Sequence, residues 1–116
     1  MIADAVQESL VATLNVPQRD RFQIISSHTD SEFVFDREYL DIPRSDRFVM
    51  VGVTLAAGRS VETKQAFYAD LCERLVAAVE LRPEDLAVSL IENQREDWSF
   101  GHGYASYLTI PRDQWR

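Results

Sequence analysis

One arginine in this sequence is well placed to bind an anion. Arg59 follows a long apolar run and stands between Gly58 and Ser60, directly before a helical pattern. The free N–H groups at the amino end of a helix favour anions, and a guanidinium group can hold a carboxylate through two parallel hydrogen bonds. Trp98 and Phe100 follow a second apolar run and supply aromatic rings that can exclude water. Together these residues predict a site for a small carboxylate.

Each of these residues also has a plainer interpretation, which the sequence leaves open. Arg59 can be an ordinary solvated charge at the start of a helix. Asp20, the other acidic candidate, is equally suited to cap a turn or begin a strand. Trp98 and Phe100 can belong to the hydrophobic core.

Two segments with helical spacing and several strand-like segments must position the candidates. Apolar residues spaced three to four apart predict a helix over 2–14, which ends near Asn15 because Pro17 forces extended backbone before it. Residues 21–27 and 32–36 are then predicted to be strands.

The second part of the chain predicts a β-α-β unit. The segment 47–56 is nearly continuously apolar, which favours a strand covered on both faces. A helix over 61–79, capped by Ser60, and a strand over 86–92 follow. Strands joined in this way run parallel, so Arg59 and Trp98 should lie at the same edge of the sheet. Gly101 and Gly103 lie in the tail, residues 97–108, and predict a tight turn followed by one more short strand.

The sequence contains a weak internal repeat. A helix, a proline, an acidic residue and a strand occur twice, with Pro17 and Pro83 lying 66 positions apart. A strand precedes the helix in the second copy but not in the first. We therefore expect that a strand is missing from the front of the chain.

Composition limits the kinds of partner. The chain has 116 residues, a net charge of −7, a single cysteine and no apolar stretch of about 20 residues. We expect one cytoplasmic α+β domain over 1–116, with neither nucleic acid nor membrane as a partner. No phosphate-binding glycine loop and no metal ligands at suitable spacing are present, so we expect no cofactor and no metal.

Three segments resemble the tautomerase superfamily, and more narrowly its malonate semialdehyde decarboxylase branch. They are Val-Pro-Gln-Arg-Asp-Arg-Phe-Gln-Ile-Ile-Ser-Ser-His at 16–28, Asp-Leu-Ala-Val-Ser-Leu-Ile-Glu-Asn at 85–93 and Asp-Trp-Ser-Phe-Gly-His-Gly at 97–103. The resemblance implies a repeated β-α-β fold, with two helices packed on a mixed sheet of about four strands. It also implies a homotrimer, and a catalytic proline that leads the first strand. No proline occurs before Pro17, so we expect that strand to be missing here, either because the start of the sequence was placed too late or because this member lacks the proline.

The resemblance gives roles to individual positions. Asp20 matches an aspartate that helps with water or with the substrate carboxylate, and Arg59 matches an arginine that binds that carboxylate. The decarboxylase has a second arginine where this chain has Ala57, which puts decarboxylation in doubt and leaves keto–enol chemistry open. Trp98 and Phe100 match aromatic residues of the pocket wall.

These observations predict a tautomerase-superfamily protein that acts on a small oxo acid, by keto–enol tautomerisation or by decarboxylation or hydration of a 3-oxo acid. Without the leading proline, we expect the 116-residue chain to be inactive. The alternatives are a non-catalytic trimer that binds carboxylates and an unrelated ferredoxin-like binding module. In the family the first strand lies between 21–27 and 47–56, so we expect this gap either to close or to be filled by a neighbouring chain.

Overall fold

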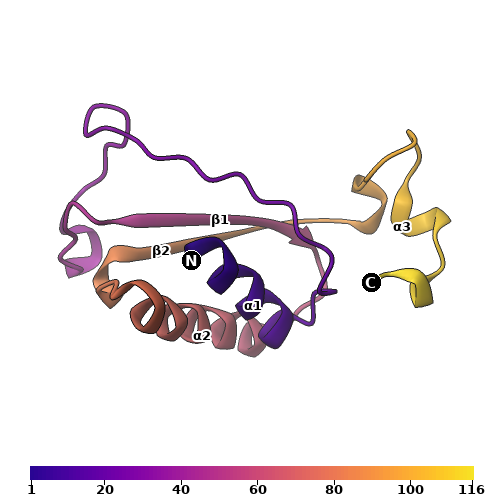
Figure 1. The fold of residues 1–116 in the computed structure, drawn as a ribbon, viewed down its shortest axis with the longest axis horizontal. Helices are drawn as coiled ribbons and strands as arrows, with labels where there is room; N and C mark the ends of the chain where they lie inside the picture. The colour runs from indigo at the N-terminus through magenta and orange to yellow at the C-terminus, as the bar shows by residue number, and fades with distance from the viewer.

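The computed structural model describes residues 1–116 and has two layers, with two long helices packed on one face of a small sheet (Figure 1). The C-terminal residues, from about 95 onward, extend beyond one end of the sheet (Figure 1). In chain order the helices and strands are α1 (Ile2–Leu14), β1 (Val49–Ala56), α2 (Val61–Val79), β2 (Leu86–Asn93) and α3 (Ser106–Thr109).

The β-α-β unit predicted for the second part of the chain is confirmed. β1 and β2 pair in parallel, from Val49 opposite Leu86 to Ala56 opposite Asn93. The side chain of Ser60 accepts a hydrogen bond from the amide of Thr63 at 3.1 Å and so caps α2. α1 also agrees closely with its predicted bounds.

The core lies between the helices and one face of the sheet. Phe67, Leu71 and Leu75 of α2 are fully buried there and pack with Leu14 and Leu55. Burial of such side chains is the main source of stability in a small domain. The buried polar groups at the helix interface are satisfied as well, and no buried side-chain polar atom lacks a hydrogen-bond partner.

Within the single chain the outer face of the sheet is open, so the helices and loops of this chain cover residues 47–56 on one face and not on both as predicted. Exposure alternates along β1, and Met50 is 62% exposed while Leu55 is buried. Ile91 of β2 is similarly exposed at 58%. The apolar run is continuous because both faces carry hydrophobic residues, but the helices cover only one of them.

Three predicted strands are absent, and the sheet has two strands in place of about four. Residues 21–27 are extended, but the backbone of 22–28 makes no hydrogen bond to other backbone. Residues 32–36 are a turn followed by irregular chain. A strand needs a neighbour to satisfy its N–H and C=O groups, and these segments have none.

The tail also differs from its prediction. In place of a short strand it forms α3, which is followed by a 3₁₀ turn. Gly103 has a φ of 76° and the preceding His102 a φ of 63°, so the chain reverses sharply there. The amide of Ser106 then bonds to the carbonyl of Trp98 at 3.1 Å and closes the loop locally. This folds the tail back on itself, away from any strand edge.

The gap predicted beside β1 is present, and the chain does not close it by pairing residues 21–27 with β1. The extended segment 21–27 passes alongside β1 without pairing with it (Figure 1). A cavity of about 1880 Å³ separates them, lined by this segment, the inner residues of α1 and the whole of β1. None of the helices is long and apolar enough to cross a membrane.

Candidate functional site

The candidate site lies at one end of the large cavity. There β1 and β2 both reach their carboxyl ends, α1 ends, and the C-terminal segment begins to extend outward (Figure 1). Asp20, Arg59, Trp98, Tyr107 and Trp115 all line the cavity at this end. The carboxyl edge of parallel strands is where ligands usually bind in α/β sheets, so the predicted location is reasonable.

Arg59 is half-buried and is held by the backbone around it. Its Nε donates to the carbonyl of Leu14 at 3.0 Å, and its Nη1 donates to the carbonyl of Ala56, also at 3.0 Å. These bonds tie the end of α1 to the end of β1 and fix the guanidinium group in the cavity wall. A guanidinium group has five N–H donors, so three of them remain for a ligand. Arg59 therefore has a structural role at the end of β1, and its remaining donors are placed in the cavity wall.

Asp20 lies after the turn that follows α1, and it lines the same cavity as Arg59. Its amide donates to the carbonyl of Pro17 at 2.9 Å, and its own carbonyl accepts from the side-chain amide of Gln7 at 3.2 Å. The backbone is thus fixed, while the carboxylate has a single hydrogen bond, which comes from the hydroxyl of Tyr107 at 3.3 Å. A half-buried carboxylate with so few partners has free lone pairs for substrate or water.

Aromatic rings form one wall of the site. Trp98 is fixed by a 2.7 Å hydrogen bond from its indole N–H to Asn93, the last residue of β2. Tyr107 packs edge-on against Trp115 with ring centroids 4.6 Å apart. Phe100 does not line the cavity, since it stacks on Trp98 at 5.2 Å and supports Tyr107 from behind at 5.3 Å.

Tyr107 has the most perturbed acid–base group in this region. Burial of the phenol, together with the neighbouring charge of Asp20, raises the pKa of Tyr107 to about 12. The positive charges of Arg59 and Arg95 act in the opposite direction without cancelling this effect. The hydroxyl therefore stays protonated at neutral pH and serves as a hydrogen-bond donor.

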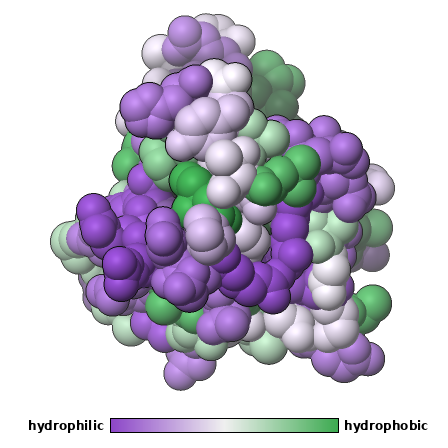
Figure 2. All heavy atoms as spheres, turned by 90° about the vertical axis from the view of Figure 1, so that its right-hand side faces the viewer, coloured by the Kyte–Doolittle hydropathy of each residue, from purple (hydrophilic) through white to green (hydrophobic).

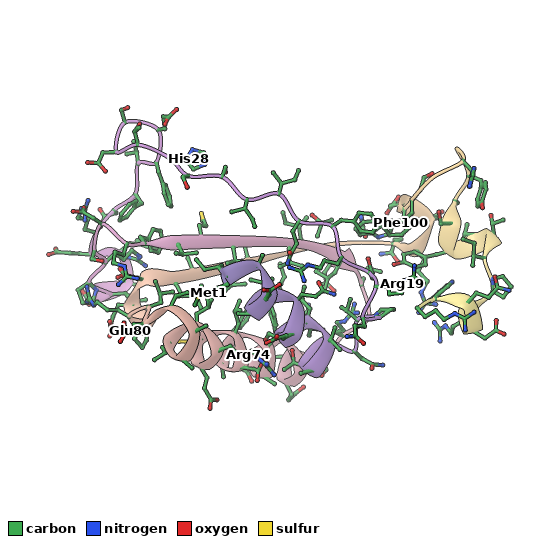
Figure 3. All side chains as sticks on the ribbon, viewed as in Figure 1. Met1, Arg19, His28, Arg74, Glu80 and Phe100 are labelled. Carbon is green, nitrogen blue, oxygen red and sulfur yellow. The ribbon has the colours of Figure 1, made fainter.

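The site is positively charged although the chain as a whole is negative. Arginines converge on the cavity end from several segments, and Figure 3 shows Arg19 beside the C-terminal segment. The nearest acidic residue of the strands, Glu92, is already paired with Lys64 at 2.8 Å, and this contact lowers the pKa of Glu92. Such a concentration of guanidinium groups favours an anionic ligand. The arginines that line this end are Arg19, Arg59, Arg95, Arg112 and Arg116.

The surface around the site is mixed. Figure 2 views the molecule from this end and shows a largely hydrophilic face with hydrophobic atoms exposed near its centre. The residues that line the cavity are likewise mixed, with hydrophobic and polar side chains in similar number.

The predicted residues come together only in part. The structure brings Asp20, Arg59 and Trp98 to one cavity and places Phe100 in the layer behind it. Sequence reasoning missed Tyr107 and the additional arginines. Tyr107 is visible in the sequence as an aromatic residue of the tail. The strand predicted there did not place it near Asp20.

The fold and the site define an α+β protein with a β-α-β unit and an arginine-lined cavity at the carboxyl edge of its sheet. The family model for tautomerase enzymes matches residues 20–101. The chain is 36% identical over 107 residues to the probable tautomerase YusQ of Bacillus subtilis (strain 168), covering 92% of this chain and 84% of that protein. It is 37% identical over 108 residues to the probable tautomerase YrdN of the same organism, covering 93% and 83%. The chain belongs to the tautomerase superfamily.

Solved structures agree with this assignment. One is a crystal structure of the FG41 malonate semialdehyde decarboxylase inhibited by 3-bromopropiolate. It is 40% identical to this chain, with a TM-score of 0.85, and the match covers 95% of this chain and 86% of the decarboxylase chain. A second malonate semialdehyde decarboxylase, described as having decarboxylase and hydratase activities, is 36% identical with a TM-score of 0.86, covering 93% and 83%. A fused 4-OT that forms a symmetric trimer shares the fold, at 19% identity and a TM-score of 0.67 with 89% and 81% covered.

Proposed function

We propose that the protein is an enzyme acting on a small oxo acid, by keto–enol tautomerisation or by decarboxylation or hydration of a 3-oxo acid. Arg59 binds the substrate carboxylate, Asp20 assists at the reacting atoms, and Trp98 forms the wall with Phe100 behind it. The catalytic base or acid is a terminal proline on a strand that occupies the cavity beside β1.

One observation carries this proposal. A single cavity joins the unpaired edge of β1 to Arg59, Asp20 and the aromatic wall. Its volume of about 1880 Å³ exceeds the roughly 300–1,000 Å³ of ordinary small-molecule pockets. The unpaired backbone of 22–28 lies on its opposite side. A β-strand inserted there would satisfy the backbone on both sides and leave only the end of the cavity open to substrate.

The direction of such a strand follows from the fold. A strand that leads into α1 would form a β-α-β unit with the extended segment 21–27 and would therefore run parallel to it. That segment starts next to Asp20, at the site end of the cavity (Figure 1). The first residue of the inserted strand would consequently lie beside Asp20 and Arg59. The amino group of that first residue would then lie within the candidate site.

The chemistry of a terminal proline suits the surroundings. A free α-amino group has a pKa of about 8, and burial next to the arginines of the cavity would lower it. A neutral secondary amine can take a proton from an enol or a carbon acid, and its protonated form can return the proton to the other atom. Because Ala57 stands where the decarboxylase has a second arginine, Arg59 alone holds the carboxylate from this segment, which favours tautomerisation.

We propose further that the protein is a homotrimer of single domains, each formed by residues 1–116 together with the inserted strand. The open face of the sheet exposes Met50 and Ile91, and exposed apolar surface of this kind usually marks an interface. The fused 4-OT neighbour, which has the same fold, is a symmetric trimer.

Carboxylate binding by Arg59 is the direct test. Titration calorimetry with pyruvate or malonate should give a dissociation constant around millimolar for the wild-type protein. Arg59→Ala should weaken binding by about ten-fold or more, because a hydrogen bond to a charged group contributes about 1.5–3 kcal/mol. Arg37→Ala is a matched control, since Arg37 also lines the cavity and is exposed but pairs with Asp46 near the start of β1, and we expect a much smaller effect.

The two backbone hydrogen bonds of Arg59 call for a stability control. Urea unfolding should show that Arg59→Ala remains folded with a modest loss of stability. Indistinguishable binding curves for the wild type and the folded variant would assign Arg59 to the scaffold and remove the basis for an oxo-acid substrate. Binding that depends on Arg59, without turnover in the protein carrying a proline-led strand, would identify a non-catalytic carboxylate-binding member of the family.

A further inference from the structure

The hydroxyl group of Tyr107 donates the only hydrogen bond that the carboxylate of Asp20 receives. We propose that Tyr107 is a positioning residue, which fixes the carboxylate of Asp20 in the orientation that the reaction needs. The proposal rests on the function proposed above, because it assigns Asp20 a part in the reaction. It adds a further residue of the C-terminal segment to a site that already includes Trp98 and Trp115.

Asp20 needs such a partner because only its backbone is otherwise held. The turn to Pro17 and the contact with Gln7 fix the main chain, but both side-chain torsions of an aspartate can still adopt several staggered states. A hydrogen bond to Oδ2 selects one rotamer and leaves the other carboxylate oxygen free for substrate or water.

Tyr107 is rigid enough to act in this way. Its ring is held edge-on by Phe100 at 5.3 Å and by Trp115 at 4.6 Å, with Trp98 on a further side at 6.4 Å. The preceding residue, Ser106, is buried, and its hydroxyl accepts a hydrogen bond from the amide of Phe100 at 2.9 Å. The ring therefore has little freedom, and its hydroxyl is directed at Asp20.

The arrangement also explains the chemistry of the phenol. A group that must donate to a carboxylate has to keep its proton over the working pH range. The pKa of Tyr107, raised to about 12, meets this requirement. The C-terminal segment would thus order the catalytic carboxylate through a single neutral donor.

A double-mutant cycle tests the proposal in the protein that carries the proline-led strand. Tyr107→Phe should lower kcat for tautomerisation about three- to ten-fold, which corresponds to the loss of one hydrogen bond, and should leave KM unchanged. In an Asp20→Asn background the same substitution should have no further effect, because the carboxylate that it orients is gone. Tyr104→Phe is the matched control, since Tyr104 stacks on His102 in the same tail, 39% exposed, and makes no hydrogen bond to Asp20.

Tyrosine labelled with carbon-13 at Cζ supplies a readout that does not depend on turnover. Asp20→Asn should shift the resonance of Tyr107 and leave that of Tyr104 in place. An unmoved Tyr107 resonance, or equal losses of kcat from Tyr107→Phe with and without Asp20, would overturn the positioning role. Failure of the proposed function itself is distinguishable, because the wild-type protein with its strand would then show no turnover at all.

Discussion

The two halves of this molecule share a sequence pattern but differ in whether the predicted strands pair. In the second half a strand, a helix and a strand form a complete unit with eight paired residues in each strand. In the first half the helix is present, and the segment after it is extended, but the backbone of 22–28 pairs with nothing. The comparison shows that strand-like sequence forms a strand only where a neighbouring edge lies within hydrogen-bonding distance.

The corresponding acidic residues of the two halves, Asp85 and Asp20, also differ in burial and in hydrogen bonding. Asp85 precedes β2, is fully buried, and accepts hydrogen bonds from the amide and hydroxyl of Ser45 at 2.7 and 2.6 Å. Asp20 precedes the unpaired segment and faces the cavity with one weak partner. One copy of the motif is used for structure, while the other is available for chemistry.

Hydrogen exchange should show the largest difference between the halves. The amides of α2 and β2 are bonded and next to the core, so they should exchange only through global or near-global opening. The amides of 22–28 should exchange almost as fast as in an unfolded peptide, at least about 1,000-fold faster. Equal protection would mean that the segment 22–28 has a partner in solution. Addition of a proline-led strand should bring its protection up toward that of β2.

Truncation of a phenylalanine should lower the free energy of unfolding much more in the second half than in the first. Phe67 is fully buried, and Phe67→Ala should lower the free energy of unfolding by about 3–5 kcal/mol. Phe22 is 74% exposed, and Phe22→Ala should cost less than about 0.5 kcal/mol in the 116-residue chain. Urea denaturation measures both. A large effect of Phe22→Ala would contradict the account of the first half as an unpacked segment.

The two aspartates offer a smaller and pH-dependent contrast. Asp85→Asn should destabilise the protein by about 2–3 kcal/mol at pH 7, whereas Asp20→Asn should change stability by less than about 0.5 kcal/mol. Burial would raise the pKa of Asp85, but the hydrogen bonds from Ser45 outweigh it and lower the pKa below its ordinary value.

The sign of the pH dependence follows from this lowered pKa. The charged form of Asp85 stabilises the fold fully above the unfolded-state pKa of about 3.9. This contribution is lost as the pH falls through the lower pKa of the folded state. The difference between wild type and Asp85→Asn should therefore narrow below about pH 4, as urea midpoints at pH 7 and pH 3 can show. A difference that is constant or grows in acid would contradict the assignment.

The sequence predicts the elements that depend on local pattern. The bounds of α1 and α2 are confirmed, as are β1 and β2 to within two residues. These elements bury a regular apolar stripe against one another, so spacing alone identifies them. The segment 21–27 has equally good strand propensity, but its pairing depends on a neighbour that the pattern cannot supply.

The site was predictable for residues just after the strands and not for residues further along the tail. Arg59 and Trp98 follow parallel strands, and that topology brings them to one edge. Phe100 was expected in the pocket wall, but it packs behind Trp98 because the chain turns back after it. Tyr107 reaches Asp20 from 87 residues away along the chain. Only the folded tail, with its left-handed residues at 102 and 103, brings the two together.

The central claim is that the cavity beside β1 is the place of a strand whose first residue completes the active site. The most direct measurement is the ketonisation of phenylpyruvate enol, followed by ultraviolet absorbance, for three forms of the protein. These are the 116-residue chain, the chain preceded by a proline-led strand, and the same strand led by alanine. We predict turnover only for the proline-led form, with the alanine-led form folded but inactive. Equal turnover by all three forms would contradict the claim and show that the catalytic group lies elsewhere in the chain.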